Sequence, residues 1–386
     1  MASTYPHPRN WEPFPCPIAC YNQGMTSLPT RHPLSTLPLL DEFDSQPLIA
    51  AASRVRTPPI LPIDLTGRDR HLLKDLFESR LLTLRQVATI HFADRYPMAK
   101  KRIAKLRLAK LVGAKRARIA NTEQLFLFLT RRGFDLIAEG LSLHYGDDLS
   151  FRALERRVSV AWRTVEHEHA VAEFKAAFVR AARTSETPLT IPTFQTWPRL
   201  IQFEAVRPVE TGDYNFGTKL LTKPSLLQPD AFFRLHDGDT DHHLYLEMDR
   251  STEKHGTLLS KAIGYRDWLQ SGGHARRFGF QRPEEVPFRV LVVLKNEERR
   301  NNFFDTLLRH PKPAKGLIWA STFDEVRRDP LGAHWLTPHD YQRVVKGHPH
   351  FDPLIRNASP VYIRRPERET LVSRLARNQR LFRQIP

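Results

Sequence analysis

Three carboxylates in the stretch 228–265 have a spacing that could support chemistry. Asp230 and the pair Glu247 and Asp249 lie on two segments that alternate like short β-strands, joined by an acidic turn. If the turn is centred between residues 238 and 239, an antiparallel pairing places Asp230 directly across from Glu247, with Cβ atoms ~5 Å apart. Side chains alternate along a strand, so Glu247 and Asp249 share a face. The sequence therefore predicts that three carboxylates converge.

Converging carboxylates are unfavourable unless a cation or a proton lies between them. Hard oxygen ligands with room for water suit Mg²⁺ or Mn²⁺, and such a metal ion polarises a phosphoryl oxygen and helps to generate hydroxide near neutral pH. Lys261, a turn or so into the following helix, could supply the further positive charge that phosphodiester cleavage needs. Tyr265 lies four residues after Lys261 and shares that helix face.

Plainer interpretations of the same stretch stay open. Glu247 and Asp249 could form an ordinary exposed strand end. The aspartates of the turn imitate a calcium-binding loop, but His242 replaces its glycine and Met248 its final glutamate, so we interpret them as turn residues. His242 and the adjacent His243 lack the partners of a zinc site, and we expect them at the surface.

The domain that contains these carboxylates follows a basic N-terminal region. Residues 67–140 hold 17 Lys and Arg against 7 Asp and Glu, so +10 of the net +17 lies in under a fifth of the chain. Helical periodicity predicts three helices here, followed by a two-stranded hairpin and a closing helix. Thr83 is placed as the N-cap of the second helix, and Gly113 is expected to end the third. This order is that of a winged helix-turn-helix domain, which we assign to residues 67–145.

The third helix of such a domain would enter the major groove of DNA, and the positive charge is densest there. A basic helix that is simply solvated is the alternative interpretation. The residues that we predict to contact DNA lie on this helix and on the hairpin, and they are Lys100, Lys101, Arg102, Lys105, Arg107, Lys110, Lys115, Arg116 and Arg118.

The sequence pattern after the first domain predicts a second domain over residues 150–330. It begins with a long helix or helix pair at 151–183, and strands and helices alternate irregularly after it. The predicted strands are residues 199–206, 230–235, 243–248, 288–294 and 316–321. Residues 1–66, which hold 12 of the 30 prolines, are expected to form a flexible leader, or else a proline-rich arm that packs on the folded part. Residues 331–386 form a C-terminal extension with a basic amphipathic helix.

The composition limits the partners and the compartment. A net charge of +17 and a pI near 10.1 favour a polyanionic partner, of which double-stranded DNA is the first candidate. A ribosome or a membrane surface would attract the same charge. The only cysteines, Cys16 and Cys20, allow neither a disulfide framework nor a four-cysteine zinc site. No window approaches the ~18 apolar residues of a membrane span, and no signal peptide is visible, so we expect a cytoplasmic protein.

The motifs around the carboxylates resemble those of a known nuclease superfamily. Pro229 and Asp230, then a hairpin, then Glu247 and Asp249, in the order helix, three strands, helix, strand, look like the PD-(D/E)xK nucleases. More closely, "LFLFLTRRGFDLIAEG", "EHEHAVAEF", "QPDAFF", "LEMDRSTE" and "KAIGY" are similar to the plasmid replication-relaxation family, whose relatives include the MobC-type mobilisation relaxases. The resemblance covers about residues 67–325.

This resemblance implies a fold and a set of site residues. The fold is α+β overall, with an N-terminal winged helix-turn-helix followed by an α/β restriction-endonuclease-like domain with a central mixed sheet. The acid that the superfamily carries on its first helix falls on Glu173, or else on Glu168.

The resemblance also assigns roles to the residues of the hairpin and the next helix. Asp230 and Glu247 become metal ligands, and Asp249 occupies the position where the superfamily usually has its catalytic lysine. Because a carboxylate there reverses the local charge, Lys261 becomes the candidate for a migrated lysine, with Asp249 as a third metal ligand. By the same resemblance, Tyr265 is either a covalent nucleophile of the relaxase type or a ring that packs beneath the helix.

The function expected from the residues and the resemblance together is a DNA-binding, metal-dependent DNA-nicking protein of a mobile element, in plasmid replication or mobilisation. It would use Mg²⁺ or Mn²⁺, form a homodimer on palindromic sites, and meet other mobile-element proteins. A non-catalytic DNA-binding regulator with a degenerate nuclease core is an alternative. A nuclease-like subunit of a transposition or defence complex is another.

Overall fold

The protein is described here by a computed structural model, which covers residues 63–145, 150–211, 219–238, 240–250, 255–310, 316–344 and 370–376. The leader predicted over residues 1–66 lies outside these residues except at its last few positions. The described chain is α+β, with a mixed five-stranded sheet flanked by helices. No helix in these ranges is long and apolar enough to cross a membrane.

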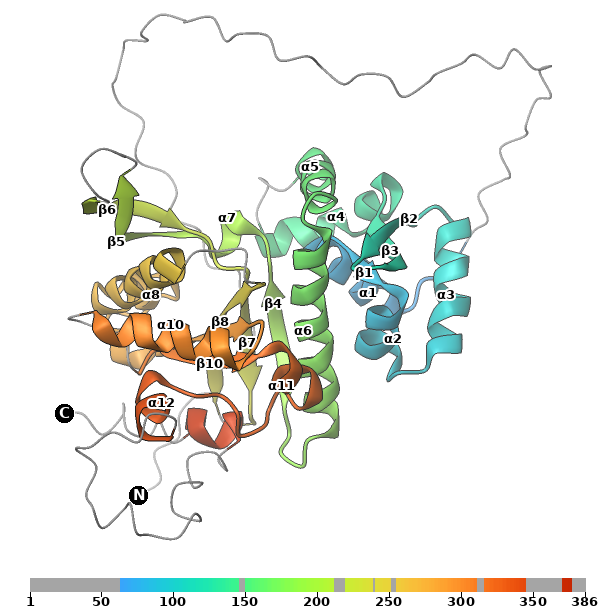
Figure 1. The fold of residues 1–386 in the computed structure, drawn as a ribbon. Coiled ribbons are helices and arrows are strands. Elements are labelled where there is room, and N and C mark those ends of the chain that lie inside the picture. The colour runs from blue at the N-terminus through green and yellow to red at the C-terminus, as the bar shows by residue number, and fades with distance from the viewer. Residues whose placement is uncertain are drawn as a thin grey trace, which may run out of the picture. The chain divides into compact units, whose positions relative to one another are not determined.

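Three helices and a hairpin form the first part of the described chain (Figure 1), in the order predicted from the sequence. A short strand before the second helix completes a three-stranded sheet in the order β1, β3, β2. The elements are α1 (Gly67–Ser79), β1 (Leu82–Thr83), α2 (Leu84–Phe92), α3 (Tyr96–Leu108), β2 (Val112–Ile119), β3 (Thr122–Leu129), α4 (Arg131–Tyr145) and α5 (Phe151–Ala161).

Side-chain caps define where α1 and α2 begin. The Thr66 hydroxyl accepts a hydrogen bond from the Asp69 N–H, and the Asp69 carboxylate accepts one from the Thr66 N–H. Thr83 and Gln86 form the same reciprocal arrangement at α2. Each box satisfies two backbone donors that a helix start leaves without partners. The prediction that Thr83 caps the second helix is confirmed.

The third helix ends earlier than predicted. α3 stops at Leu108, and Gly113, expected to end the helix, lies inside β2 across from Phe128. A Cβ atom at Gly113 would lie 2.4 Å from the Phe128 ring. The glycine is therefore needed because a ring from the neighbouring strand covers its backbone, which is a common reason for glycine within a strand.

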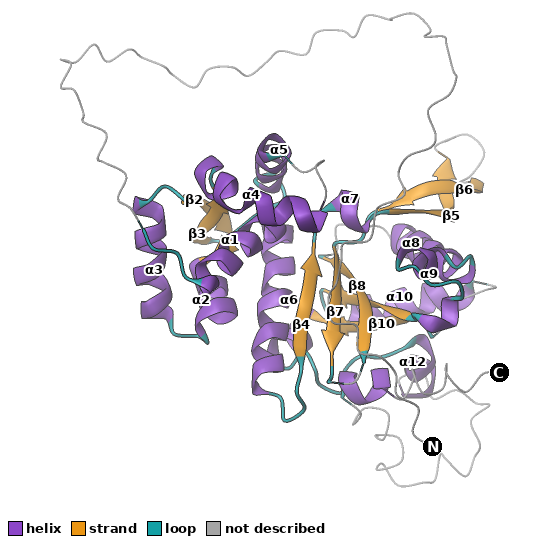
Figure 2. Cartoon of the chain, turned by 180° about the vertical axis from the view of Figure 1, so that it is seen from behind, coloured by secondary structure: helices purple, strands orange, loops and turns teal. Residues whose placement is uncertain are grey.

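A mixed five-stranded sheet forms the centre of the second part (Figure 2), with the strand order β10, β9, β8, β7, β4. Its strands are β4 (Thr190–Gln195), β7 (Ala231–His236), β8 (Asp241–Asp249), β9 (Phe288–Leu294) and β10 (Ile318–Thr322). β4, β7 and β8 are antiparallel to one another in turn, whereas β8, β9 and β10 are parallel. Four of the predicted strands are confirmed here, and β4 was missed.

The strand predicted at residues 199–206 is confirmed only from Phe203 onward, and it does not belong to the five-stranded sheet. Pro198–Ile201 form the short helix α7, and β5 (Phe203–Thr211) pairs with β6 (Lys219–Leu227) in a separate two-stranded sheet. Phe203 at the start of β5 stacks on Trp268, with 3.7 Å between ring centroids. Aromatic packing on a helix, rather than a ladder with the larger sheet, therefore positions this segment.

The two faces of the five-stranded sheet carry different layers. α6 (Val165–Thr184) covers one face, where Phe174 packs on Phe233. α8 (His255–Gln270) and α10 (Glu297–Arg309) cover the other face. Because side chains alternate along β8, Met248 lies on the α6 side, while Glu247 contacts α8 and Asp249 contacts α10.

The remaining helices are α8 (His255–Gln270), α9 (Gly273–Arg277), the 3₁₀ turn η1 (Pro283–Glu285), α10 (Glu297–Arg309), α11 (Phe323–Arg328) and α12 (Pro338–Val344). The C-terminal basic helix predicted in the tail is described only over residues 371–376, which are helical. Leu371 and Leu375 are buried in the same core as α6, and Arg374 donates to Asp340 at 2.6 Å. This part of the tail therefore packs on the sheet domain.

α6 contacts both the N-terminal helices and the five-stranded sheet, and it lies beside α2 and β4 in both views (Figures 1 and 2). Lys175, in the middle of α6, donates to Asp75 of α1 at 3.0 Å. Beyond the helix, the Trp197 indole N–H donates to the carbonyl of Phe77 at 3.1 Å. Buried polar contacts thus join α1 to α6 and to the segment that follows β4.

Candidate functional site

Asp230 and Glu247 lie opposite each other at the end of the β7–β8 ladder. The register pairs Ala231 with Leu246, and the Asp230 N–H donates to the carbonyl of Leu246 at 3.0 Å. The next opposed pair along the ladder is Asp230 and Glu247, in the register predicted from the turn. Glu247 is 2% exposed, so one member of the pair is a carboxylate held away from water.

Two side chains from α8 bind Glu247. Lys261 Nζ donates to Glu247 Oε2 at 2.9 Å, and the Tyr265 hydroxyl donates to Oε1 at 2.7 Å. Lys261 and Tyr265 are four residues apart, so they project from one helix face toward the sheet. Burial raises the pKa of Glu247 to about 7, with the charge of Asp230 acting in the same direction and the charge of Lys261 acting against it. The charge of Lys261 therefore only partly offsets the effect of burial on this carboxylate.

Asp230 is bound by α6 and by the neighbouring strand. His167 Nε2 lies 3.0 Å from Asp230 Oδ1, and the Met248 N–H donates to Oδ2 at 2.7 Å. Burial alone would raise the pKa of Asp230, but the hydrogen bond and charge of His167 outweigh it and lower the pKa. The same contact raises the pKa of His167 although burial opposes it. Sequence reasoning gave His167 no role, because its partner lies 63 residues away.

Asp249 is held apart from this pair by Arg299 of α10, whose Nε donates to Asp249 Oδ2 at 2.7 Å. The Asp249 side chain has no exposed surface, and that of Arg299 is 15% exposed. Among the described residues, no three or more His, Cys, Asp or Glu side chains form a group that could hold a metal ion. The predicted convergence of three carboxylates is therefore wrong, because a buried guanidinium neutralises the third.

Tyr265 is fully buried among rings from three other elements, Phe203, Tyr245 and Phe288. Burial raises the pKa of the Tyr265 hydroxyl well above its usual value, and the charge of Glu247 adds to this effect. Of the two roles considered for Tyr265, its surroundings favour the ring that packs beneath the helix over the covalent nucleophile. Its hydroxyl orients Glu247.

The two acids proposed for the first helix of the nuclease core lie elsewhere. Glu173 Oε1 accepts a hydrogen bond from Gln86 of α2 at 2.8 Å and lies 3.7 Å from His169. Glu168 forms an ion pair with Arg80. Neither reaches Asp230, and the residue of α6 that does is His167. A helix face cannot be assigned from spacing alone when both faces of the helix are covered.

His242 and His243 are buried rather than exposed, so the surface location expected for them is wrong. His242 Nε2 lies 2.7 Å from Asp237 Oδ2. His243 Nδ1 lies 3.1 Å from His274 Nε2, and His274 Nδ1 lies 3.2 Å from the Tyr245 hydroxyl. Adjacent residues on a strand face opposite sides, so burial of both shows that β8 is covered on both faces.

α3 presents an exposed row of cations away from its buried face. Ala99, Ile103 and Leu106 are buried, while the exposed cations of the helix are Lys100, Lys101, Lys105 and Arg107. Arg102 differs from these, because its guanidinium donates to both oxygens of Asp69 in the cap of α1, at 2.8 and 2.5 Å. Its charge holds α3 against α1.

The hairpin after α3 extends the basic surface. Lys110, Lys115, Arg116 and Arg118 are all exposed. Lys115 Nζ lies 4.9 Å from the centre of the Trp162 ring, and Arg116 pairs with Glu123 at 2.6 Å in an exposed ion pair. Exposed pairs of this kind are weak, so the arginine stays available to a stronger anion.

A divalent cation at this end of the ladder would have two carboxylates to bind, Asp230 and Glu247. Mg²⁺ is usually held by one or two carboxylates, with waters and substrate phosphates completing its shell. A cation beside Glu247 would stabilise the charged form that burial disfavours. In the structure, Lys261 and Tyr265 bind the two oxygens of Glu247, and His167 contacts Asp230.

One family matches the chain, and its description is replication-relaxation. The match covers residues 73–282, which is just over half of the chain and includes α3, the hairpin, the Asp230–Glu247 pair and Lys261. No curated protein and no solved structure matches the chain.

Proposed function

The chain belongs to the replication-relaxation family, and from this membership we propose that it acts on DNA during plasmid replication or mobilisation. In this proposal, residues 67–145 form a winged helix that binds double-stranded DNA. Residues 150–330 form a PD-(D/E)xK-like domain that nicks one strand with Mg²⁺ or Mn²⁺. The observation that carries the proposal is the opposition of Asp230 and Glu247, with Lys261 bound to Glu247.

The order of elements supports the nuclease part of the proposal. α6, the antiparallel strands β4, β7 and β8, then α8 and the parallel strand β9 follow the order helix, three strands, helix, strand. The acidic pair lies at the start of β7 and the end of β8, where the resemblance places it. This agreement involves six elements and is more specific than any of the short motifs alone.

The roles of the residues follow from their contacts. Asp230 and Glu247 would hold the cation, which when bound supplies Lewis-acid polarisation of a phosphoryl oxygen. Lys261 places a positive charge beside the site, where it stabilises negative charge that develops on the phosphate. His167 positions Asp230 through its 3.0 Å contact. Because Tyr265 is buried against Glu247, the nucleophile in this proposal is water.

The basic surface of α3 and the hairpin supports the DNA-binding part. Its cations project from the solvent side of α3, as they must to reach phosphates. Each phosphate that a cation neutralises releases a counterion, so binding should weaken steeply with salt. Arg102 is excluded from this surface by its bond to Asp69.

The test is nicking of supercoiled plasmid with Mg²⁺ or Mn²⁺. We expect open-circle product from the wild-type protein, and a loss of at least ~100-fold in rate for Asp230→Asn and Glu247→Gln, since even partners of metal ligands are worth 10- to 100-fold. Asp241→Asn is the matched control, because Asp241 lies exposed at the other end of β8. The proposal is wrong if the wild-type protein makes no open circle, or if the two carboxylate variants nick at the wild-type rate.

A non-catalytic DNA-binding regulator or replication accessory is the second candidate function. It is favoured by Arg299, which neutralises Asp249 at the position where the superfamily has its lysine. In that case Asp230→Asn should leave plasmid maintenance unchanged in cells, whereas Lys101→Met with Lys105→Met should abolish it. The two candidates therefore differ in the outcome of one carboxylate substitution.

A further inference from the structure

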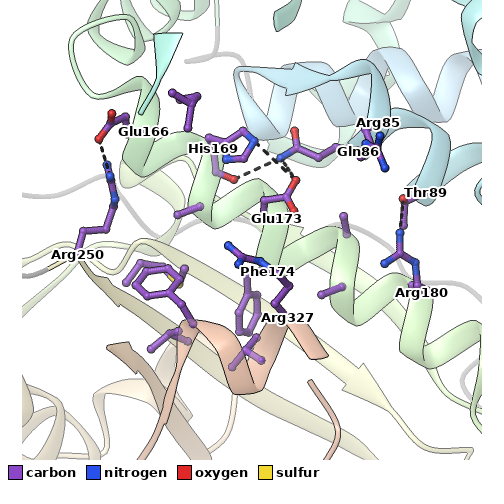
Figure 3. Close-up of a pocket in the computed structure, with 18 of the residues that line it drawn as sticks. Arg85, Gln86, Thr89, Glu166, His169, Glu173, Phe174, Arg180, Arg250 and Arg327 are labelled. Atoms are coloured by element: carbon purple, nitrogen blue, oxygen red, sulfur yellow. Dashed lines mark hydrogen bonds and ion pairs between the residues drawn. The ribbon is translucent and has the colours of Figure 1, made fainter. Parts of the chain in front are cut away.

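A cavity of about 620 Å³ lies on the α6 side of the five-stranded sheet (Figure 3), the face opposite Glu247. It is lined by the residues that directly follow the three parallel strands: Arg250 after β8, Lys295 after β9 and Phe323 after β10. In open α/β sheets, ligands bind outside the carboxyl ends of such strands. Ligand cavities usually measure roughly 300 to 1,000 Å³, so the place and the size both fit a small-molecule site.

The rim of the cavity is cationic. The five positively charged lining residues are Arg85, Arg180, Arg250, Lys295 and Arg327, against two carboxylates. Figure 3 shows Arg250 bound to Glu166 at one end of the cavity and Arg180 bound to Thr89 at the other. Arg85 and Lys295 have no hydrogen-bond or ion-pair partner among the described residues. These two side chains are therefore available to an anion.

The floor of the cavity is apolar. Met248, Val293 and Val326 are buried members of the core under α6, and Phe174 lies beside them. Phe323 is half-buried and adds an aromatic ring to the lining. A nucleobase has a flat apolar face that stacks on such rings.

The polar groups between floor and rim are held in place before any ligand binds. The Gln86 side chain accepts from the Thr83 N–H at 2.7 Å and donates to Glu173 Oε1 at 2.8 Å. Burial lowers the pKa of His169 below its usual value, which favours the neutral ring. Glu173 Oε2 has no partner among the described residues and can accept from an amino group of a base. Such preorganisation reduces the entropy lost on binding.

We propose that this cavity binds a nucleotide, with the phosphate on the cationic rim at Arg85 and Lys295 and the base on the apolar floor. Charge alone would attract any anion, but the combination of unpaired cations, an aromatic floor and a carboxylate acceptor fits a nucleotide best. The nucleotide is either free or one unit of a single DNA strand. The site lies on the other face of the sheet from Glu247, and neither Asp230 nor Glu247 lines it.

The first experiment measures binding of two probes without divalent cation, dAMP by calorimetry and fluorescein-labelled single-stranded (dA)12 by anisotropy. The oligonucleotide is tested in a Lys101→Met, Lys105→Met background, which removes charge from α3. Binding of dAMP supports the proposal and identifies a free nucleotide as sufficient. Binding of (dA)12 alone supports it with a DNA strand as the source. Binding of neither probe overturns it.

The second experiment localises the binding. Arg85→Met with Lys295→Met should weaken it about tenfold or more, since hydrogen bonds to charged groups contribute roughly 1.5 to 3 kcal/mol each. The matched control is Arg309→Met with Arg328→Met, which removes the same charge from exposed positions outside the cavity. Equal affinities for both double variants would show nonspecific attraction and overturn the proposal.

A third variant separates shape from charge. Ala177 lines the cavity on α6 and is partly exposed, so Ala177→Phe fills the space without changing the net charge. We expect a loss of tenfold or more in affinity with an unchanged melting temperature. Wild-type affinity in this variant contradicts the site. We expect Asp230→Asn to bind both probes with wild-type affinity. Nucleotide binding would therefore be observed even if the protein does not nick plasmid DNA.

Discussion

Glu247 keeps its carboxylate in the protein interior because Lys261 and Tyr265 both donate to it. The two donors are not equivalent. Lys261 brings a charge to the site, whereas Tyr265 brings a fixed hydroxyl from within an aromatic cluster. Removing the lysine changes the charge of the site, whereas removing the hydroxyl changes only how firmly the Glu247 carboxylate is oriented.

Tyr265→Phe tests the second role. The ring still packs, but Glu247 Oε1 loses its donor, so we expect the free energy of unfolding to fall by about 1 to 3 kcal/mol. Urea denaturation measures this loss. We also expect no covalent adduct between the wild-type protein and labelled plasmid DNA. An adduct that disappears in Tyr265→Phe would show that the hydroxyl is a nucleophile after all.

The buried His243 predicts how stability depends on pH. Burial lowers its pKa from the usual 6.5 to about 4. Below pH 6.5 the unfolded chain binds a proton that the folded protein does not bind until about pH 4, so stability is lost as the pH falls through this window. Urea denaturation at pH 7 and pH 5 should show a smaller difference for His243→Gln than for wild type. His236→Gln, in the exposed end of the same hairpin, should keep the wild-type difference.

At the scale of elements, the contact between α1 and α3 shows which cation of α3 has a structural role and is not available to DNA. Arg102 donates to a fully buried Asp69, which also caps α1. Arg102→Met leaves that carboxylate without its cation, a change that costs about 3 to 5 kcal/mol for buried pairs. The neighbouring Lys101 is exposed and has no such bond.

The prediction compares these two adjacent residues. Arg102→Met should lower the melting temperature strongly, whereas Lys101→Met should leave it unchanged and weaken duplex binding with a shallower salt dependence. Differential scanning calorimetry and a salt titration of DNA affinity measure the two effects. Equal melting temperatures would contradict the structural role of Arg102.

The elements also show what local signals can predict. The β7–β8 register follows from a short turn and strict alternation, so the opposition of Asp230 and Glu247 was predictable. Gly113 was misinterpreted, because the reason for the glycine is a ring on another strand. β4 was missed because its burial alternates weakly and its partner lies far along the chain.

At the scale of the whole molecule, the tail takes part in the core of the sheet domain. Leu371 and Leu375 are almost completely buried against the face that α6 covers. We expect Leu371→Ala or Leu375→Ala to reduce the free energy of unfolding by about 2 to 5 kcal/mol each, since both leave a cavity. Ser373→Ala, on the exposed side of the same turn, should cost little. Wild-type stability in the leucine variants would show that the tail does not pack.

The sequence by itself determined the α+β class, the basic N-terminal helices and the pair Asp230 and Glu247, because periodicity and hairpin register depend on neighbours along the chain. Tertiary structure alone decided that Arg299 neutralises Asp249, that His167 rather than Glu173 reaches Asp230, and that Arg102 is structural. Those contacts join residues 33 to 63 positions apart. The charge state and the role of an ionisable side chain depend on the partner that folding brings to it. The spacing of residues along the sequence does not identify that partner.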